Sequence, residues 1–319
     1  MLKILANDGI HADGKAMLEN AGIEVDTMKI PQEELMDKLN DYDGIIVRSA
    51  TKVRADLIDA CPNLKVIARG GVGLDNIDVQ HASEKGIPVY NTPAASSNSV
   101  AELALGHMMN LSRFLHQSNR SMPTSGTTDF KVLKKSFGGG VELAGKTLGI
   151  IGLGRIGQEM ARIALALRMK VLPVDPMVKE ANINIEMYSS DEVGLSIKLK
   201  SVTMEKMLAE ADYLTIHVPF SGGKPIIGSE EIAQMKKGSF IINTSRGGAV
   251  DEDALFEALQ SGHIAGAGLD VFVNEPTPDE RLLKMDNISL SPHIGAATHE
   301  AQRNIGIELA EKLIDFLLE

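Results

Sequence analysis

The sequence contains a single cysteine, Cys61, among its 319 residues. One thiol cannot form an internal disulfide, and no second cysteine is present to form the paired ligands of a typical metal site. The sequence also lacks any run of about 18 apolar residues, the length that a membrane-spanning helix needs. Lys3 and Asp8 lie where a secretion signal would be apolar. We therefore expect a cytoplasmic protein with no disulfide and no membrane partner.

Positively charged residues are outnumbered, because 32 Lys and Arg face 43 Asp and Glu and give a formal net charge of −11. A field of this sign repels nucleic acids and anionic lipids, so neither is an expected partner. A small anionic substrate remains possible, provided that a few arginines converge in one cleft. The apolar share of 44% and the charged share of 24% are ordinary for a folded globular protein, and the length suggests about two domains.

Short apolar runs alternate with longer amphipathic stretches along most of the chain. This alternation is typical of βαβ units, so the sequence predicts an α/β fold with parallel sheets. The expected strands are residues 3–6, 24–28, 44–47, 65–68, 88–90, 147–151, 170–174, 213–217, 240–243, 266–269 and 288–290. The polar segment 91–99 has no apolar period, and a long apolar helix is expected over 100–115 with Ser99 as its N-cap. We place a domain boundary there.

Three later segments differ from this alternation. Residues 117–141 are polar and rich in Gly and Lys, as expected of an exposed arm, and residues 182–201 form an irregular β-like stretch with no readable role. Residues 298–318 have apolar side chains at helical spacing but no sheet of their own to cover. We expect this last helix to pack back on the first domain, so that the chain crosses between its domains twice.

The strongest local motif is a glycine-rich turn after the expected strand 147–151. Its residues are Gly152, Leu153, Gly154, Arg155, Ile156 and Gly157. Glycines at this spacing allow a tight turn, close approach of a pyrophosphate and close helix packing, and the following helix N-terminus favours negative charge. Asp175 follows the third glycine by 18 residues, where a carboxylate can bind a ribose diol and would repel a 2′-phosphate. The motif predicts an NAD site, although a ligand-free turn, a methyltransferase or a flavoprotein would share its geometry.

Three polar residues of the second half have complementary chemistry, namely Arg246, Glu275 and His293. Each lies at the end of an expected strand or in the loop that follows one, and ligands of parallel sheets bind at the carboxyl ends of strands. An imidazole can accept a hydroxyl proton as a hydride leaves, a carboxylate can stabilise the imidazolium, and an arginine can hold a substrate carboxylate through two hydrogen bonds. Taken singly, each residue is more often a structural or solvated group, so the prediction depends on the set.

The chain resembles the D-isomer-specific 2-hydroxyacid dehydrogenases from about residue 43 to residue 310. The shared blocks are RSATKV (48–53), ARGGVGLDNID (68–78), NTP and SVAEL within 91–103, GLGRIG (152–157), HVP (217–219), NTSRGGAVDEDAL (243–255), GAGLDVFVNEP (266–276) and SPHIGAAT (291–298). The resemblance implies two doubly wound parallel-sheet domains. A Rossmann-type cofactor domain of residues 99–293 is inserted in a flavodoxin-like substrate domain of residues 1–98 and 294–319. It also implies a homodimer built in part by the helix after Ser99.

The same resemblance assigns roles to individual residues. It matches Arg246 to the substrate-binding arginine, Glu275 to the carboxylate partner and His293 to the acid/base histidine. The residues implied at the cofactor site are Gly152, Gly154, Arg155, Ile156, Gly157, Asp175, His217, Val218, Pro219, Thr244, Ser245, Arg246, Asp270, His293 and Gly295. Those implied at the substrate site are Arg48, Ser49, Arg69, Gly71, Val72, Gly73, Arg246 and His293.

Within the family, the run RSATKV is most similar to the phosphoglycerate dehydrogenases. There the residues matching Arg48 and Arg69 help to hold the substrate phosphate, whereas arginines taken alone are usually surface charges. The resemblance implies NAD-dependent oxidation of D-3-phosphoglycerate to 3-phosphohydroxypyruvate, the first step of phosphorylated serine biosynthesis. A glycerate or hydroxypyruvate reductase, another D-2-hydroxyacid dehydrogenase, or a non-enzymatic NAD-sensing corepressor remain alternatives. The complete set of arginines, Glu275 and His293 favours an enzyme.

Some segments depart from the family pattern, and no role is transferred to residues 94–97, 127–131 or about 181–201. The chain ends at Glu319, so no C-terminal regulatory domain is expected. Cys61 is expected to be an inert thiol. The remaining histidines show no metal-ligand spacing and are interpreted as structural: His11, His81, His107, His116, His263 and His299. No metal is expected.

Overall fold

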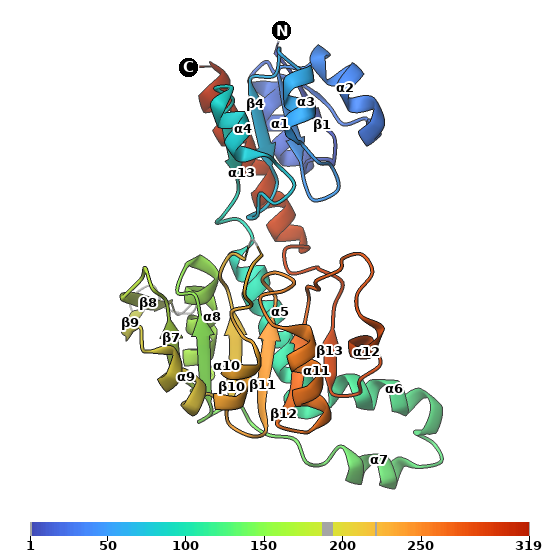
Figure 1. Ribbon diagram of the computed structural model, residues 1–319, viewed down its shortest axis with the longest axis vertical. Coiled ribbons are helices and arrows are strands. Elements are labelled where there is room, and N and C mark those ends of the chain that lie inside the picture. The colour runs from blue at the N-terminus through green and yellow to red at the C-terminus, as the bar shows by residue number, and fades with distance from the viewer. Residues whose placement is uncertain (1, 187–193, 221, 319) are drawn as a thin grey trace. The chain divides into compact units, whose positions relative to one another are not determined.

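The computed structural model describes residues 2–186, 194–220 and 222–318 (Figure 1). It forms two compact units, the first made of Met1–Ser99 with Ala296–Glu319 and the second of Val100–Gly295. The chain therefore passes between the units twice. The second unit begins one residue later and ends two residues later than the cofactor domain expected from the sequence.

The first unit is built on a five-stranded parallel sheet in the flavodoxin-like order β2-β1-β3-β4-β5. Its strands are β1 (Lys3–Ala6), β2 (Glu24–Asp26), β3 (Gly44–Val47), β4 (Val66–Arg69) and β5 (Val89–Asn91). Its helices are α1 (Ala12–Asn20), α2 (Leu35–Lys38), α3 (Ala55–Ala60), α4 (Val79–Glu84) and α13 (His299–Leu318), with 3₁₀ turns at Gln32–Glu34 and Leu39–Asp41. Helices α1 and α13 cover one face of the sheet, and α2, α3 and α4 contribute to the core on the other.

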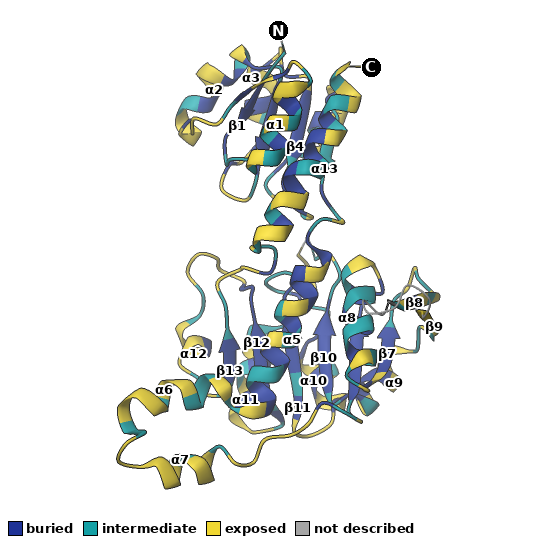
Figure 2. Ribbon diagram, turned by 180° about the vertical axis from the view of Figure 1, so that it is seen from behind, coloured by how far each residue is buried: buried dark blue, intermediate teal, exposed yellow. Residues whose placement is uncertain are grey.

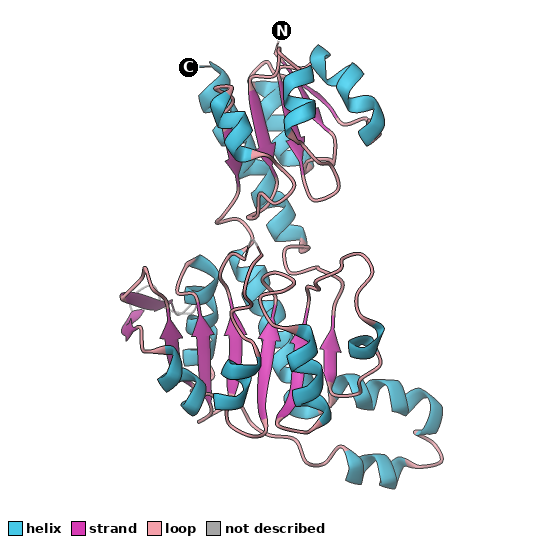
Figure 3. Ribbon diagram, viewed as in Figure 1, coloured by secondary structure: helices cyan, strands magenta, loops and turns pink. Residues whose placement is uncertain are grey.

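The second unit is built on a six-stranded parallel sheet in the order β13-β12-β11-β10-β6-β7. Its strands are β6 (Thr147–Ile151), β7 (Lys170–Val174), β10 (Tyr213–Ile216), β11 (Ser239–Asn243), β12 (Ile264–Leu269) and β13 (Ile288–Leu290). Its helices include α5 (Ser97–Arg113), α8 (Arg155–Ala166), α9 (Met204–Glu210), α10 (Ser229–Gln234), α11 (Glu252–Gln260) and α12 (Glu280–Leu283). Helices α5 and α8 pack on one face, and α9, α10 and α11 on the other (Figure 3). Both sheets are doubly wound, as the sequence predicted.

A β-hairpin follows β7 instead of a further helix and parallel strand. Its strands β8 (Glu180–Glu186) and β9 (Gly194–Lys200) pair in antiparallel register. Ile183 is buried in the core of this unit, so the hairpin packs beside α8. The remainder of the β-like stretch, residues 187–193, lies outside the described residues.

Two expectations near the start of the second unit need correction or refinement. Helix α5 begins at Ser97, so Ser99 is not its N-cap and that prediction was wrong. The polar residues 97–99 add a first turn that the apolar pattern does not reveal, and Ser99 Oγ lies 2.8 Å from Thr298 Oγ1. The expected arm contains two helices, α6 (Leu115–Ser125) and α7 (Phe130–Ser136), which are largely exposed (Figure 2).

Candidate active site

The residues expected to bind the cofactor all lie at one edge of the second sheet. Because the six strands are parallel, their carboxyl ends share that edge. The groups follow β6 (152–157), β7 (Asp175), β10 (217–219), β11 (244–246), β12 (Asp270) and β13 (His293 and Gly295). Strand β6 lies between β7 and β10. The chain therefore continues from β6 to the neighbouring strand on one side, β7, and later returns to form the neighbouring strand on the other side, β10. Folds of this kind bind ligands in the crevice at such a point.

The glycine-rich turn joins β6 directly to α8. Gly152 has φ +96°, a conformation that favours glycine, and α8 begins at Arg155. A Cβ at Gly157 would collide with the carbonyl oxygen of Gly152, so the helix can approach the turn only with glycine at that position. The N-terminus of a twelve-residue helix is thereby presented at the sheet edge, where its amide groups favour a phosphate.

The Asp175 carboxylate binds a backbone amide of the glycine-rich turn and two backbone amides of the turn that follows β7. Its Oδ2 accepts a hydrogen bond from Leu153 N at 2.7 Å, and its Oδ1 accepts bonds from Met177 N and Val178 N at 2.8 and 2.9 Å. Burial by itself raises the pKa of Asp175, but these amides and the charge of Lys179 outweigh it and lower the pKa below its usual value. The group is therefore a carboxylate at neutral pH, beside the glycine-rich turn.

Two buried polar atoms at the same edge have no hydrogen-bond partner among the described residues. They are His217 Nδ1 after β10 and Thr244 Oγ1 after β11. The other ring nitrogen of His217 lies 3.0 Å from Thr215 Oγ1, and burial lowers the pKa of His217 to about 3, so the ring is neutral. Buried polar atoms normally have partners. Their presence, together with the glycine-rich turn, fits a bound polar cofactor.

Glu275 and His293 form a close pair in the second unit. His293 Nδ1 lies 2.7 Å from Glu275 Oε2, and Glu275 Oε1 accepts a hydrogen bond from Phe272 N at 2.9 Å. Since the carboxylate can only accept, Nδ1 carries the proton, and Nε2 of the neutral ring retains its lone pair. The His293 side chain is 49% exposed, so the ring is open to solvent on part of its surface.

Asp270 holds the loop that contains His293. Its Oδ1 accepts a hydrogen bond from Ile294 N and its Oδ2 one from Gly295 N, both at 2.9 Å. The backbone carbonyl of Asp270 accepts from His293 N at 2.7 Å. His293 has φ +54°, which is unfavourable for a residue with a side chain, and these contacts hold it in that conformation.

Arg246 lies after β11 in a loop with its own internal hydrogen bonds. Asn243 Nδ2 donates to Arg246 O at 2.9 Å, and Arg246 Nη1 donates to Ser245 O at 2.7 Å. A Cβ at Gly247 would collide with the Phe272 carbonyl, so this loop packs directly against the turn that contains Glu275. The three residues of the predicted catalytic set therefore lie on adjoining loops.

The remaining predicted substrate residues belong to the first unit. Arg48 follows β3 and Arg69 ends β4, and these strands are neighbours, with Val47 paired to Arg69. Asn91 Nδ2 donates to Val72 O at 2.6 Å and Thr92 N to Gly71 O at 3.0 Å, which attaches the 70–73 loop to the end of β5. A cavity of about 270 Å³ opens at this edge, lined by Asp8, Gly9, Ile10, His11, Arg48, Gly70, Gln302, Ile305, Gly306 and Leu309.

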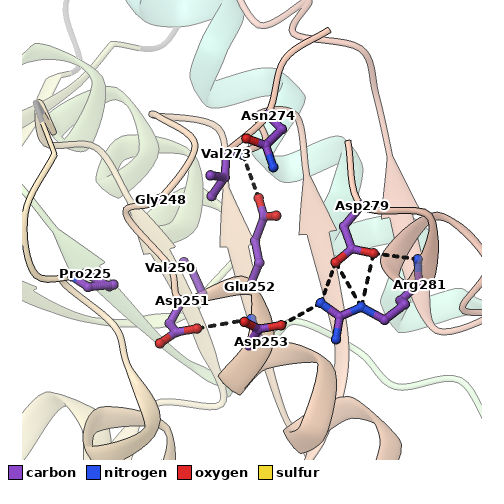
Figure 4. Close-up of a pocket in the computed structure, with 10 residues that line it drawn as sticks. All are labelled: Pro225, Gly248, Val250, Asp251, Glu252, Asp253, Val273, Asn274, Asp279 and Arg281. Atoms are coloured by element: carbon purple, nitrogen blue, oxygen red, sulfur yellow. Dashed lines mark hydrogen bonds and ion pairs between the residues drawn. The ribbon is translucent and has the colours of Figure 1, made fainter. Parts of the chain in front are cut away.

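A second pocket of about 390 Å³ lies in the second unit and is mainly acidic (Figure 4). Asp251 caps α11, and Arg281 forms ion pairs with Asp253 and Asp279. None of the predicted site residues lines it, and its charge does not suit an anionic substrate. Glu252 Oε1, however, accepts from Val273 N at 2.8 Å, and so supports the Glu275 turn from this side. No residue pattern predicted this contact.

The fold, the glycine-rich turn and the polar residues at the strand ends define a dinucleotide-binding α/β protein. Residues 105–295 match the family described as "D-isomer specific 2-hydroxyacid dehydrogenase, NAD binding domain". The hydroxypyruvate reductase of Thermotoga maritima is 45% identical over 98% of this chain and 97% of its own length. The D-3-phosphoglycerate dehydrogenase of Methanocaldococcus jannaschii is also 45% identical over 98% of this chain, but over 57% of its own length. The structure of D-mandelate dehydrogenase from Rhodotorula graminis gives a TM-score of 0.84 at 26% identity, covering 99% of this chain and 95% of that one.

The chain belongs to the D-isomer-specific 2-hydroxyacid dehydrogenase family, and its cofactor is NAD. It spans little more than half the length of the phosphoglycerate dehydrogenase relatives and almost the whole of the reductase. The predictions of family, fold class and NAD are confirmed. Within the described residues, no helix is both long and apolar enough to cross a lipid bilayer.

Proposed function

We propose that this protein oxidises D-3-phosphoglycerate to 3-phosphohydroxypyruvate. Relatives named for phosphoglycerate and for hydroxypyruvate are equally similar to it, so the substrate assignment depends on the residues of the first unit. The observation that carries it is the pair of arginines, Arg48 and Arg69, at adjacent strand ends, with Arg48 lining a cavity of about 270 Å³. The planar guanidinium of arginine binds phosphate oxygens through two hydrogen bonds.

Local contacts define the surroundings of both arginines. Asp8 Oδ2 accepts from Arg48 N at 2.7 Å and from Thr51 N at 3.0 Å, so these backbone contacts hold the loop that follows β3. A Cβ at Gly71 would collide with Arg69 Nη1, and Gly71 has φ +142°. The Arg69 side chain therefore lies over a position that only glycine fills without strain.

In the proposed reaction, His293 Nε2 accepts the proton of the substrate hydroxyl as a hydride leaves the same carbon. Glu275 holds the ring through Nδ1 and stabilises the imidazolium that forms, and Arg246 binds the substrate carboxylate. When bound, NAD supplies the nicotinamide ring that accepts the hydride. Arg48 and Arg69 bind the phosphate.

Kinetics with paired substrates test the phosphate assignment. Arg48→Ala or Arg69→Ala should raise KM for 3-phosphoglycerate by at least about tenfold, roughly 1.4 kcal/mol of lost binding, and leave slow turnover of D-glycerate nearly unchanged. Arg54→Ala removes an exposed arginine of the same unit and is the matched control. If both substrates suffered alike, or if the unaltered enzyme preferred glycerate or hydroxypyruvate, the reductase function would replace this proposal.

A further inference from the structure

A buried histidine lies behind the loop that carries His293. His107, on α5, is 3% exposed. Its Nδ1 lies 2.8 Å from Ser289 Oγ and its Nε2 lies 3.0 Å from Ser291 Oγ. Ser291 Oγ donates to Asp270 Oδ1 at 2.5 Å, and the two oxygens of that carboxylate accept from Ile294 N and Gly295 N. A continuous set of hydrogen bonds therefore joins α5 to the two residues after His293.

The direction of these hydrogen bonds follows from donor and acceptor chemistry. Asp270 can only accept, so the Ser291 hydroxyl proton points to it, and Ser291 Oγ must accept from His107 Nε2. Burial lowers the pKa of His107, which keeps the ring neutral, with its one proton on Nε2. Nδ1 then accepts from the Ser289 hydroxyl, whose oxygen in turn accepts from Asn110 Nδ2 at 3.0 Å. Both ring nitrogens are satisfied in a single tautomer.

The consequence for the reacting histidine is geometric. Asp270 holds the loop through three backbone amides, one on its carbonyl and two on its carboxylate, and His293 is strained at φ +54°. If Ser291 did not occupy one lone pair of Oδ1, the buried carboxylate could rotate away from one of the two amides. The position of the His293 ring would then be less sharply defined.

We propose that His107 is a positioning residue for the hydride-transfer reaction, acting through Ser291 and Asp270 on the loop that presents His293. This inference rests on the proposed acid/base role of His293. This role differs from a purely structural one, because Ser289 and Ser291 each contact one ring nitrogen, and the described hydrogen bonds connect Ser291, through Asp270, to the loop that contains His293.

Replacing His107 by Gln or by Asn tests the roles of its two ring nitrogens separately. Gln at position 107 can place a donor where Nε2 lies, whereas Asn reaches only the Nδ1 side. His107→Gln should keep most of kcat, and His107→Asn should lower kcat roughly tenfold to a hundredfold, the usual cost of misplacing a reacting group. KM for the acid and the dissociation constant for NAD should change far less. Equal kcat in the two variants, with both folded by circular dichroism, would overturn the proposal.

A double-mutant cycle tests the route. Ser291→Ala and His107→Leu should each lower kcat, and the double variant should lose little more than either, because both remove the same connection. Ser289→Ala deletes a hydroxyl of the same size on the other side of the ring and should lower thermal stability more than kcat. Additive losses for His107 and Ser291, or unchanged kcat in His107→Leu, would refute the inference. Normal turnover in His293→Ala would instead refute the proposed role of His293.

Discussion

At the scale of single residues, the chemistry of the candidate site depends on which nitrogen of His293 carries a proton. The 2.7 Å contact with Glu275 Oε2 places the proton on Nδ1, so Nε2 is the nitrogen that would act as the proposed base. Residue types alone suggested a histidine and a carboxylate that could act together. The left-handed backbone at His293 and the support from Asp270 could not be predicted, because they come from contacts between β12 and β13.

Variants of this pair test the acid/base role. His293→Ala should lose about 10² to 10⁴ fold in turnover, the usual contribution of one general base. Glu275→Gln should shift the rising limb of the oxidation rate to lower pH, because the imidazolium loses its negatively charged partner. Steady-state oxidation rates measured from roughly pH 5 to pH 10 supply the pH profile of each variant. An unshifted profile in Glu275→Gln would contradict the pairing.

At the scale of elements, the residues predicted to bind the cofactor lie on turns that follow the strands, and backbone contacts connect some of these turns to one another. Asp175 connects the β6 turn to the β7 turn through Leu153 N and Val178 N. The hairpin β8–β9 follows directly. A carboxylate at this place offers an acceptor for a ribose diol and repels a 2′-phosphate.

Asp175→Ala should weaken NAD binding and narrow the preference for NAD over NADP. Asp175→Asn keeps an acceptor for the turn amides while removing the charge, so it separates repulsion from loss of structure. Asp212→Ala is the matched control, because Asp212 also accepts from a backbone amide, Thr147 N, but at the opposite edge of the sheet. Titration of each variant with both cofactors gives the ratio of dissociation constants. An unaltered protein that already preferred NADP would contradict this assignment.

At the scale of the whole molecule, the exposed helices α6 and α7 are a candidate surface for homodimer formation. These helices present apolar side chains to solvent, with Phe130 56% and Val132 61% exposed. Exposed apolar patches of this kind commonly mark interfaces. A homodimer stays a prediction, now placed on the segment from α5 to α7.

Replacing Phe130 and Val132 by Glu should convert the expected dimer to a monomer, because an acidic pair cannot be buried in an apolar interface without a large desolvation cost. Met28→Glu changes an even more exposed apolar side chain in the first unit and should leave the mass unchanged. Light scattering after gel filtration reports the mass of each variant. A monomeric unaltered protein, or a dimer that survives both substitutions, would refute the interface.

Local sequence patterns were enough to predict the parallel α/β class, the glycine-rich turn and the position of the candidate site residues at strand ends. These features follow from local apolar periodicity and from residue types at fixed spacing, which tertiary contacts do not change. Even so, local signals located the strand ends only within one or two residues, and they misplaced the start of α5 because a polar first turn carries no apolar pattern. From the sequence, His107 was interpreted as structural, and no role was predicted for Glu252. Only the tertiary structure placed them, because Ser289, Ser291 and Asp270 lie more than 150 residues from His107 along the chain, and Glu252 reaches Val273 across two loops. Contacts of this kind form when packed strands and helices bring distant segments together, so no local pattern can encode them.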